Sequence, residues 1–143
     1  GWKQKQIAGN KEWYLRTFDN VAYACMTGYK GNAPFDSWLI SQPVDAAKMT
    51  AKTLSFDTQV NGYGSTTTTF KVFVLDGPDP ATANRTELTA TMPEAPASGY
   101  SPWTNSGTIS LAAQSGVFYI GWQYAATQDA NYATYGITNI EVK

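Results

Sequence analysis

Short segments rich in aromatic and β-branched residues recur along this chain, and few positions show the spacing of an amphipathic helix. Residues 52–60 are the clearest case, because Leu54, Phe56 and Val60 alternate with polar side chains. That alternation predicts a strand with one face packed and the other in water. The best helical candidate, residues 43–51, is only about two turns long.

Eight further segments have the composition of β-strands. Residues 66–77 and 116–124 are apolar at consecutive positions, which is typical of strands covered on both faces. Residues 37–41 predict a short apolar strand in which Trp38 and Ile40 point into the core. The remaining predicted strands are residues 12–18, 21–27, 86–92, 107–113 and 135–143.

The segments between these strands are typical of loops within one domain. Residues 76–85 and 93–106 are rich in proline, and residues 125–134 are small and polar. None has the composition of a linker between domains, and 143 residues is an ordinary size for one domain. We therefore predict a single all-β domain over residues 1–143, an antiparallel β-sandwich of the jelly-roll type, in which residues 1–11 form a loosely ordered lead-in.

The composition excludes several classes of function. The chain has no histidine, so neither a Ser-His-Asp nor a Cys-His catalytic group can form within it, and histidine zinc sites are excluded. The net charge of −1 and the scattered basic residues argue against nucleic acid as a partner. Cys25 lies in an apolar run, which predicts a buried, unreactive thiol. No apolar stretch is long enough to predict a membrane span.

Aromatic residues in the loops are the best candidates for ligand binding. Tyr100 and Trp103 lie in a loop rich in Pro, Gly and Ser, Tyr63 lies between two glycines, and Tyr132 follows an Asn. A loop ring can stack on a sugar while polar neighbours bind the sugar hydroxyls. The alternative is that these rings cap the core; the sequence favours that role for Trp103 and leaves both roles open for Tyr63 and Tyr132.

Calcium is the metal to consider, because it takes oxygen ligands from carboxylates and backbone carbonyls. Asp76 and Asp79 stand in the segment "DGPD" and could supply two carboxylates to calcium. The same residues are typical of turns, and we favour that role for them. No other cofactor is expected. A glycosidase needs two carboxylates, and eleven Asp and Glu residues are available, so this requirement excludes little, although turns and outward strand positions explain most of them.

The stretch "SWLISQPVD", residues 37–45, resembles the Trp-Leu-Ile-Ser-Pro-x-Ile-Asp motif of the choice-of-anchor J and cleaved-adhesin domains. These are jelly rolls of secreted and surface proteins of Bacteroidetes, including the adhesin regions of gingipains. Pro43 falls one position later than in the family, and Thr138 stands where the closing motif usually has Asp, which puts a family calcium site in doubt. The later motifs of the family follow in order, at residues 54–56, 70–75, 109–111, 117–124 and 135–142.

This resemblance covers roughly residues 13–143 and implies a non-catalytic extracellular module with a galactose-binding-like or carbohydrate-binding-module-like sandwich. Its function would be adhesion or carbohydrate binding, and its partner a glycan or a host or cell-surface protein. Other domains of the same polypeptide, and a lipid anchor on a removed N-terminal segment, are open options. One alternative is a spacer or protein-interaction domain without a small ligand. A glycoside hydrolase-type enzyme is less favoured.

Overall fold

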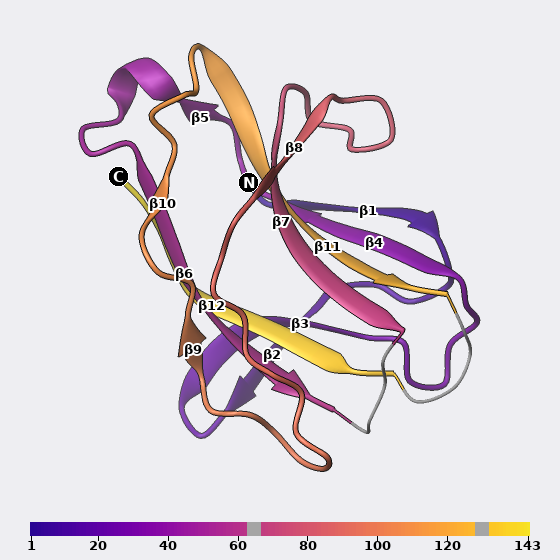
Figure 1. Cartoon of the computed structure of the whole chain (residues 1–143). Coiled ribbons are helices and arrows are strands. Elements are labelled where there is room, and N and C mark those ends of the chain that lie inside the picture. Colours follow the sequence, from indigo (N-terminus) through magenta and orange to yellow (C-terminus); the bar gives the residue numbers. More distant parts are fainter. Residues whose placement is uncertain (63–66, 128–131) are drawn as a thin grey trace.

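Two antiparallel sheets pack face to face in the computed structural model, which describes residues 1–62, 67–127 and 132–143 (Figure 1). The strands of the first sheet, sheet A, are β1 (Lys3–Ala8), β4 (Phe35–Ile40), β5 (Val44–Asp45), β7 (Thr68–Leu75), β8 (Arg85–Leu88) and β11 (Val117–Ala126). The strands of the second sheet, sheet B, are β2 (Tyr14–Phe18), β3 (Val21–Thr27), β6 (Thr53–Asn61), β9 (Thr104–Asn105), β10 (Ile109–Ser110) and β12 (Thr134–Val142).

Most of the strands that pair with each other in these sheets are distant in the sequence, as expected for a jelly roll. Sheet A has the order β1-β4-β11-β7-β8, with β5 also paired to β11. Sheet B has the order β10-β6-β12-β3-β2, with β9 also paired to β6. The prediction of an all-β antiparallel sandwich is confirmed. No helix in the described part of the chain is long and apolar enough to cross a bilayer.

The prediction of a loosely ordered lead-in at residues 1–11 is wrong, and the helical candidate at residues 43–51 contains only one helical turn. Lys3–Ala8 forms β1, which pairs with β4, so the N-terminal residues are part of the sheet. β1 is an edge strand whose outward positions carry Lys and Gln, and it therefore lacks the apolar alternation that marks a strand in the sequence. Residues 43–51 contain β5 and a one-turn 3₁₀ helix, η1 (Ala46–Lys48), which Asp45 caps by accepting from the Ala47 amide.

The core between the sheets is built around the inward side chains of β11. Ile120, Trp122 and Tyr124 alternate along this strand and are all buried. The Trp122 ring meets the Phe56 ring of β6 edge-on, with centroids 5.5 Å apart. Edge-to-face aromatic pairs of this kind contribute about 0.5–1.5 kcal/mol of stability beyond the burial of their apolar area, so this contact helps to hold the two sheets together.

A second apolar cluster lies on the outer face of sheet A. Trp38 and Ile40 are buried, as predicted, but they point away from sheet B, because Leu39 between them is the residue that pairs with inward-facing Trp122. The expectation that Trp38 and Ile40 point into the sandwich is therefore wrong. Consecutive apolar residues in a strand do not reveal which face each one takes.

Ala83 of the loop between β7 and β8, Arg85 at the start of β8 and Phe73 of β7 cover this outer cluster. The Arg85 guanidinium lies 4.7 Å from the centroid of the Trp38 ring, and the Phe73 ring packs 5.2 Å from it. The Trp38 indole donates a hydrogen bond to Asp36 Oδ1 at 2.8 Å, so its polar atom is satisfied. Trp38 is therefore shielded from solvent on the outer face of sheet A.

We predict that Trp38→Ala lowers the free energy of unfolding by about 3–5 kcal/mol, the usual cost of deleting a fully buried large side chain. Leu15 is 86% exposed, so Leu15→Ala is the matched control and changes stability by less than about 0.5 kcal/mol. Urea unfolding of the three proteins measures both values. A Trp38→Ala effect as small as that of the control would contradict the closed outer cluster.

Candidate functional site

The loop of residues 93–106 is fastened along the edge of sheet B by two serines. Ser101 donates its amide to the Val60 carbonyl at 2.7 Å, and its hydroxyl accepts from the Val60 amide at 3.0 Å. Ser106 binds both backbone groups of Phe56 in the same way, at 2.8 and 3.0 Å. Each hydroxyl satisfies a buried amide that has no strand partner. Tyr100 lies next to Ser101, so this attachment fixes its position.

Trp103 packs onto the outer face of sheet B. Its ring meets Tyr23 edge-on with centroids 5.3 Å apart, and the Tyr23 ring is buried. A Cβ at Gly136 of β12 would lie 2.7 Å from the Tyr23 ring and 3.5 Å from the Trp103 ring, so glycine makes room for both. Trp103 is half-buried, and most of its surface serves packing, which is the role that the sequence favoured.

Tyr100 remains on the surface and is held there by Arg16. Its side chain is 42% exposed, and Arg16 Nη1 donates to its hydroxyl oxygen at 2.9 Å. The guanidinium also lies 6.0 Å from the Tyr100 ring and 5.7 Å from the Phe18 ring. Tyr14, Arg16 and Phe18 alternate along β2 and therefore share its outer side. We name Tyr14, Arg16, Phe18 and Tyr100 the Tyr100 surface.

Arg16 and Tyr100 come from opposite sides of sheet B. Arg16 lies on β2 at one edge, whereas Tyr100 pairs with Asn61 at the end of β6, beyond β3 and β12. The contact between them therefore reaches across the outer face of the sheet. Tyr100 is the main cause of a raised pKa for Arg16, which keeps the guanidinium charged. The result is an ordered aromatic surface that carries a permanent cation.

Tyr14 and Cys25 form a hydrogen-bonded pair at one end of this surface. Cys25 Sγ donates to the Tyr14 hydroxyl at 3.3 Å. Burial raises the pKa of the Cys25 thiol, so it is not a reactive thiolate, and the prediction of a buried thiol is confirmed. Burial raises the pKa of Tyr14 to about 12, so its hydroxyl is neutral at physiological pH.

Asp57 belongs to a polar group on the same face of sheet B. Asn105 Nδ2 and Asn139 Nδ2 donate to its two carboxylate oxygens at 2.9 and 2.8 Å. Asn139 has a left-handed backbone, with φ of 50°, at the point where the register of β12 shifts. Because both of its oxygens accept from amides, Asp57 holds the loop and β12 together, and the two amides line the surface with polar groups.

Tyr132, another predicted ligand residue, does not contribute to this surface. Tyr132 is 6% exposed and packs edge-on against Phe35 at 5.2 Å, so it caps the core, one of the two roles that the sequence left open. Tyr63 lies outside the described residues.

The proposed calcium ligands have partners in their own loop, and Asp79 Oδ2 also lies 3.7 Å from Lys5 Nζ of β1. Asp76 accepts from the Asn84 amide and side chain, both at 2.7 Å, and Asp79 accepts from the Ala81 amide at 2.9 Å. These are the turn roles that the sequence favoured. Among the residues that the structure describes, no group of three or more His, Cys, Asp or Glu could hold a metal ion. Thr138 Oγ1 donates to the Ala22 carbonyl at 2.8 Å.

Sequence reasoning missed the contribution of β2. Neither the charge pattern nor the loop composition assigns a binding role to Arg16, Tyr14 or Phe18. Their i, i+2, i+4 spacing within the predicted strand 12–18 was enough to place them on one face. No sequence signal indicated that Tyr100, 84 positions away from Arg16, would complete that face.

Comparison with solved structures finds the same fold in adhesin domains and carbohydrate-binding modules. A cleaved adhesin domain of Lys-gingipain from Porphyromonas gingivalis is 16% identical, with a TM-score of 0.67, covering 99% of this chain and 90% of that chain. A second cleaved adhesin domain of Lys-gingipain is also 16% identical, with a TM-score of 0.58 over 96% of this chain and 90% of that one.

A family 61 carbohydrate-binding module in complex with β-1,4-galactotriose is 12% identical, with a TM-score of 0.54, covering 99% of this chain and 88% of that chain. Identities this low show a shared fold. The predicted likeness to cleaved-adhesin jelly rolls is thereby confirmed at the level of the fold, and the likeness to choice-of-anchor J domains stays a prediction. No family model and no curated protein sequence matches the chain.

We predict that Tyr14 makes the stability of the protein fall between pH 10 and about 12. Above its ordinary pKa of 10.0, Tyr14 loses its proton in the unfolded chain but keeps it in the folded one, so rising pH favours unfolding. The contribution is fully present below pH 10 and is lost as the pH passes through the folded pKa. In Tyr14→Phe, unfolding free energies from urea titrations should decline less steeply over this range. Equal slopes in both proteins would contradict the raised pKa.

Proposed function

We propose that this chain is a non-catalytic adhesion module that binds a glycan on the Tyr100 surface, in an extracellular or cell-surface setting. The observation that carries the proposal is Tyr100 itself, an exposed ring held in position by the Arg16 hydrogen bond. A ring that is already ordered can stack on a sugar without losing rotamer freedom on binding. The fold shared with a module that binds galactotriose supports a carbohydrate ligand.

Polar groups on the outer face of sheet B suit sugar hydroxyls. The Arg16 guanidinium has five N–H donors, and only one nitrogen is used by the Tyr100 hydroxyl. Asn105 and Asn139 lie on the same face of the sheet and add amide groups. Aromatic rings that give contact area, with a few placed polar groups that give orientation, are the usual composition of a small-ligand site.

Two observations support a non-catalytic role. The chain has no histidine, which removes the commonest general base. Asp57, the carboxylate of the polar group beside the Tyr100 surface, has both oxygens occupied by side-chain amides, so it is placed to hold structure and not to transfer protons. Structural calcium and a lipid anchor remain predictions that this proposal does not require.

A protein partner is the second candidate, favoured by the exposure of β2. β2 ends the order of sheet B, and its Leu15 and Phe18 side chains are among the most exposed large apolar groups in the described chain. An exposed apolar edge strand is a template for pairing with a strand of another protein. Adhesion through β2 would use a surface that is continuous with the Tyr100 surface, because Phe18 belongs to both.

The test is a glycan array probed with the wild type, Tyr100→Ala, Tyr100→Phe and Arg16→Ala. We expect Tyr100→Ala to weaken the detected glycan about tenfold or more, the size of one lost aromatic contact. Tyr100→Phe keeps the ring and loses only the hydroxyl, so it should weaken binding less. Arg16→Ala should fall between them, because it frees the ring and removes the donors.

Two further variants check the site, and two outcomes separate the glycan partner from the protein partner. Tyr29 is an exposed tyrosine between β3 and β4, so Tyr29→Ala should bind like the wild type. Trp103→Ala should reduce stability as well as binding, because Trp103 packs on Tyr23 of sheet B and lies in the same loop as Tyr100. A glycan that binds Tyr100→Ala and the wild type equally would refute the site. Protein capture that requires Leu15 and Phe18, with no glycan signal, would support the second candidate.

A further inference from the structure

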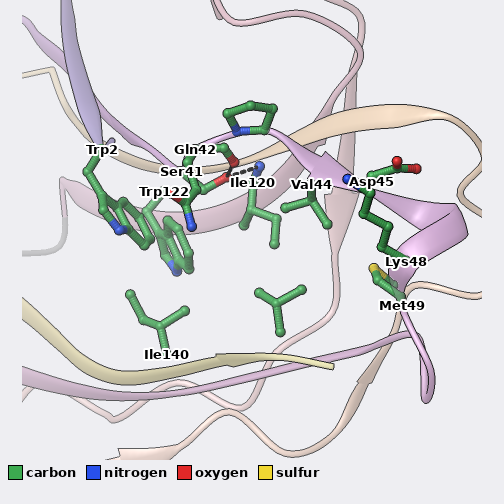
Figure 2. A pocket seen from close by; sticks show the side chains of 12 residues that line it. Trp2, Ser41, Gln42, Val44, Asp45, Lys48, Met49, Ile120, Trp122 and Ile140 are labelled. Atoms are coloured by element: carbon green, nitrogen blue, oxygen red, sulfur yellow. Dashed lines mark hydrogen bonds between the residues drawn. The ribbon is translucent and has the colours of Figure 1, made fainter.

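A cavity of about 440 Å³ opens between the two sheets, away from the Tyr100 surface. It lies where the chain leaves β4 for β5 and η1, with the end of β12 as its opposite wall. In Figure 2, Trp2 and Trp122 lie side by side at one end, and Val44 and Met49 lie at the other. The volume is within the range of about 300–1,000 Å³ that small-ligand pockets occupy.

The inner part of the cavity is mostly apolar, and its rim is polar. The aliphatic and thioether side chains of Val44, Met49, Ile120 and Ile140 line the inner part, together with the buried polar residue Ser41. The rim carries Gln42, Asp45 and Lys48, of which Gln42 and Lys48 are exposed. A ligand that fills this space therefore needs an apolar group inside and polar groups at the mouth.

Two indole rings form one wall of the cavity. Trp2 and Trp122 have ring centroids 5.5 Å apart and planes inclined by 35°. Trp122 is completely buried, whereas Trp2 is 46% exposed and lies beside β1 near the start of the chain. Trp2 can therefore turn without disturbing the core, and its exposed ring offers a stacking surface at the mouth.

The indole N–H of Trp122 is a buried donor without an acceptor in the described part of the chain. The other buried tryptophans are satisfied: Trp13 Nε1 donates to the Ser37 carbonyl at 3.3 Å, and Trp38 Nε1 donates to Asp36 at 2.8 Å. Buried polar atoms in folded proteins are nearly always paired. An unpaired donor on a ring that lines a cavity therefore points to a ligand that brings its own acceptor.

We propose that this cavity binds an acetylated sugar. An acetyl group combines the two properties that the interior selects, a methyl group for the aliphatic wall and a carbonyl oxygen that accepts from Trp122 Nε1. The pyranose ring then stacks on Trp2, and its hydroxyls meet Gln42 and Lys48 at the rim. The acetyl group can be carried on nitrogen or on oxygen, and both sources share this chemistry.

This site is a second one, and its existence does not require the Tyr100 surface to bind. Trp2 and Trp122 lie between the sheets, whereas the Tyr100 surface lies on the outer face of sheet B. The two assignments can therefore fail separately.

The test follows the five tryptophan indole N–H signals in proton–nitrogen correlation spectra of the whole chain. The probes are N-acetylglucosamine, an O-acetylated glucose and unmodified glucose. We expect the acetylated sugars to move the Trp122 signal downfield, as a new hydrogen bond does, and to bind about tenfold or more tighter than glucose. The Trp2→Ala variant should bind them about tenfold more weakly, and Tyr29→Ala should match the wild type.

Trp122→Phe provides a second variant, because it keeps a ring and removes the donor. It should lose the preference for acetylated sugars over glucose, provided that its thermal unfolding shows a folded chain. If it does not fold, the Trp122 signal and Trp2→Ala still decide the question. A response to N-acetylglucosamine alone, or to the O-acetylated sugar alone, identifies the source of the acetyl group and supports the proposal.

Three results would overturn the proposal. The first is equal binding of acetylated and unmodified glucose, and the second is a Trp122 signal that no acetylated sugar moves. The third is binding that is lost in Tyr100→Ala and kept in Trp2→Ala, which would place the sugar on the outer face of sheet B. That third result would leave the proposed function intact while removing the cavity site.

Discussion

Strand β11 is buried on both faces, and the arrangement of the rest of the molecule depends on it. Its inward side chains, Trp122 among them, pack against sheet B. On its outward side, Gly121 leaves space that a Cβ would fill, at 2.9 Å from Leu75 and 3.0 Å from Trp38. A larger residue there would displace Trp38 and open the outer cluster. One strand therefore supports the core between the sheets and the closed face of sheet A.

The two outer faces of the sandwich differ because their loops cover them differently. Ala83 of the loop between β7 and β8 and Arg85 at the start of β8 cover the Trp38 cluster on sheet A, with Arg85 stacked on the indole. The loop of residues 93–106 runs along the edge of sheet B and buries much of Trp103, but it leaves Tyr100 exposed beside Arg16. This difference is why the proposed glycan surface lies on sheet B.

How far the sequence predicted each element depended on how local its signal was. The strand at residues 52–60 could be predicted because its alternation is visible without knowing its neighbours. β1 could not, because an edge strand needs little apolar character and its Lys and Gln residues resemble a solvated tail. Trp38 was predicted to be buried, and it is, but its face depends on the pairing of Leu39 with Trp122.

The candidate sites also divide into features that local sequence signals predict and features that depend on strand pairing. The sequence by itself determined an all-β sandwich, the absence of histidine chemistry and a buried Cys25, since periodicity and composition are properties of the chain alone. Only the tertiary structure decided that Tyr100 joins Arg16 and that Trp2 meets Trp122. Those contacts depend on strand register and sheet order, which bring together residues that have no relation along the sequence.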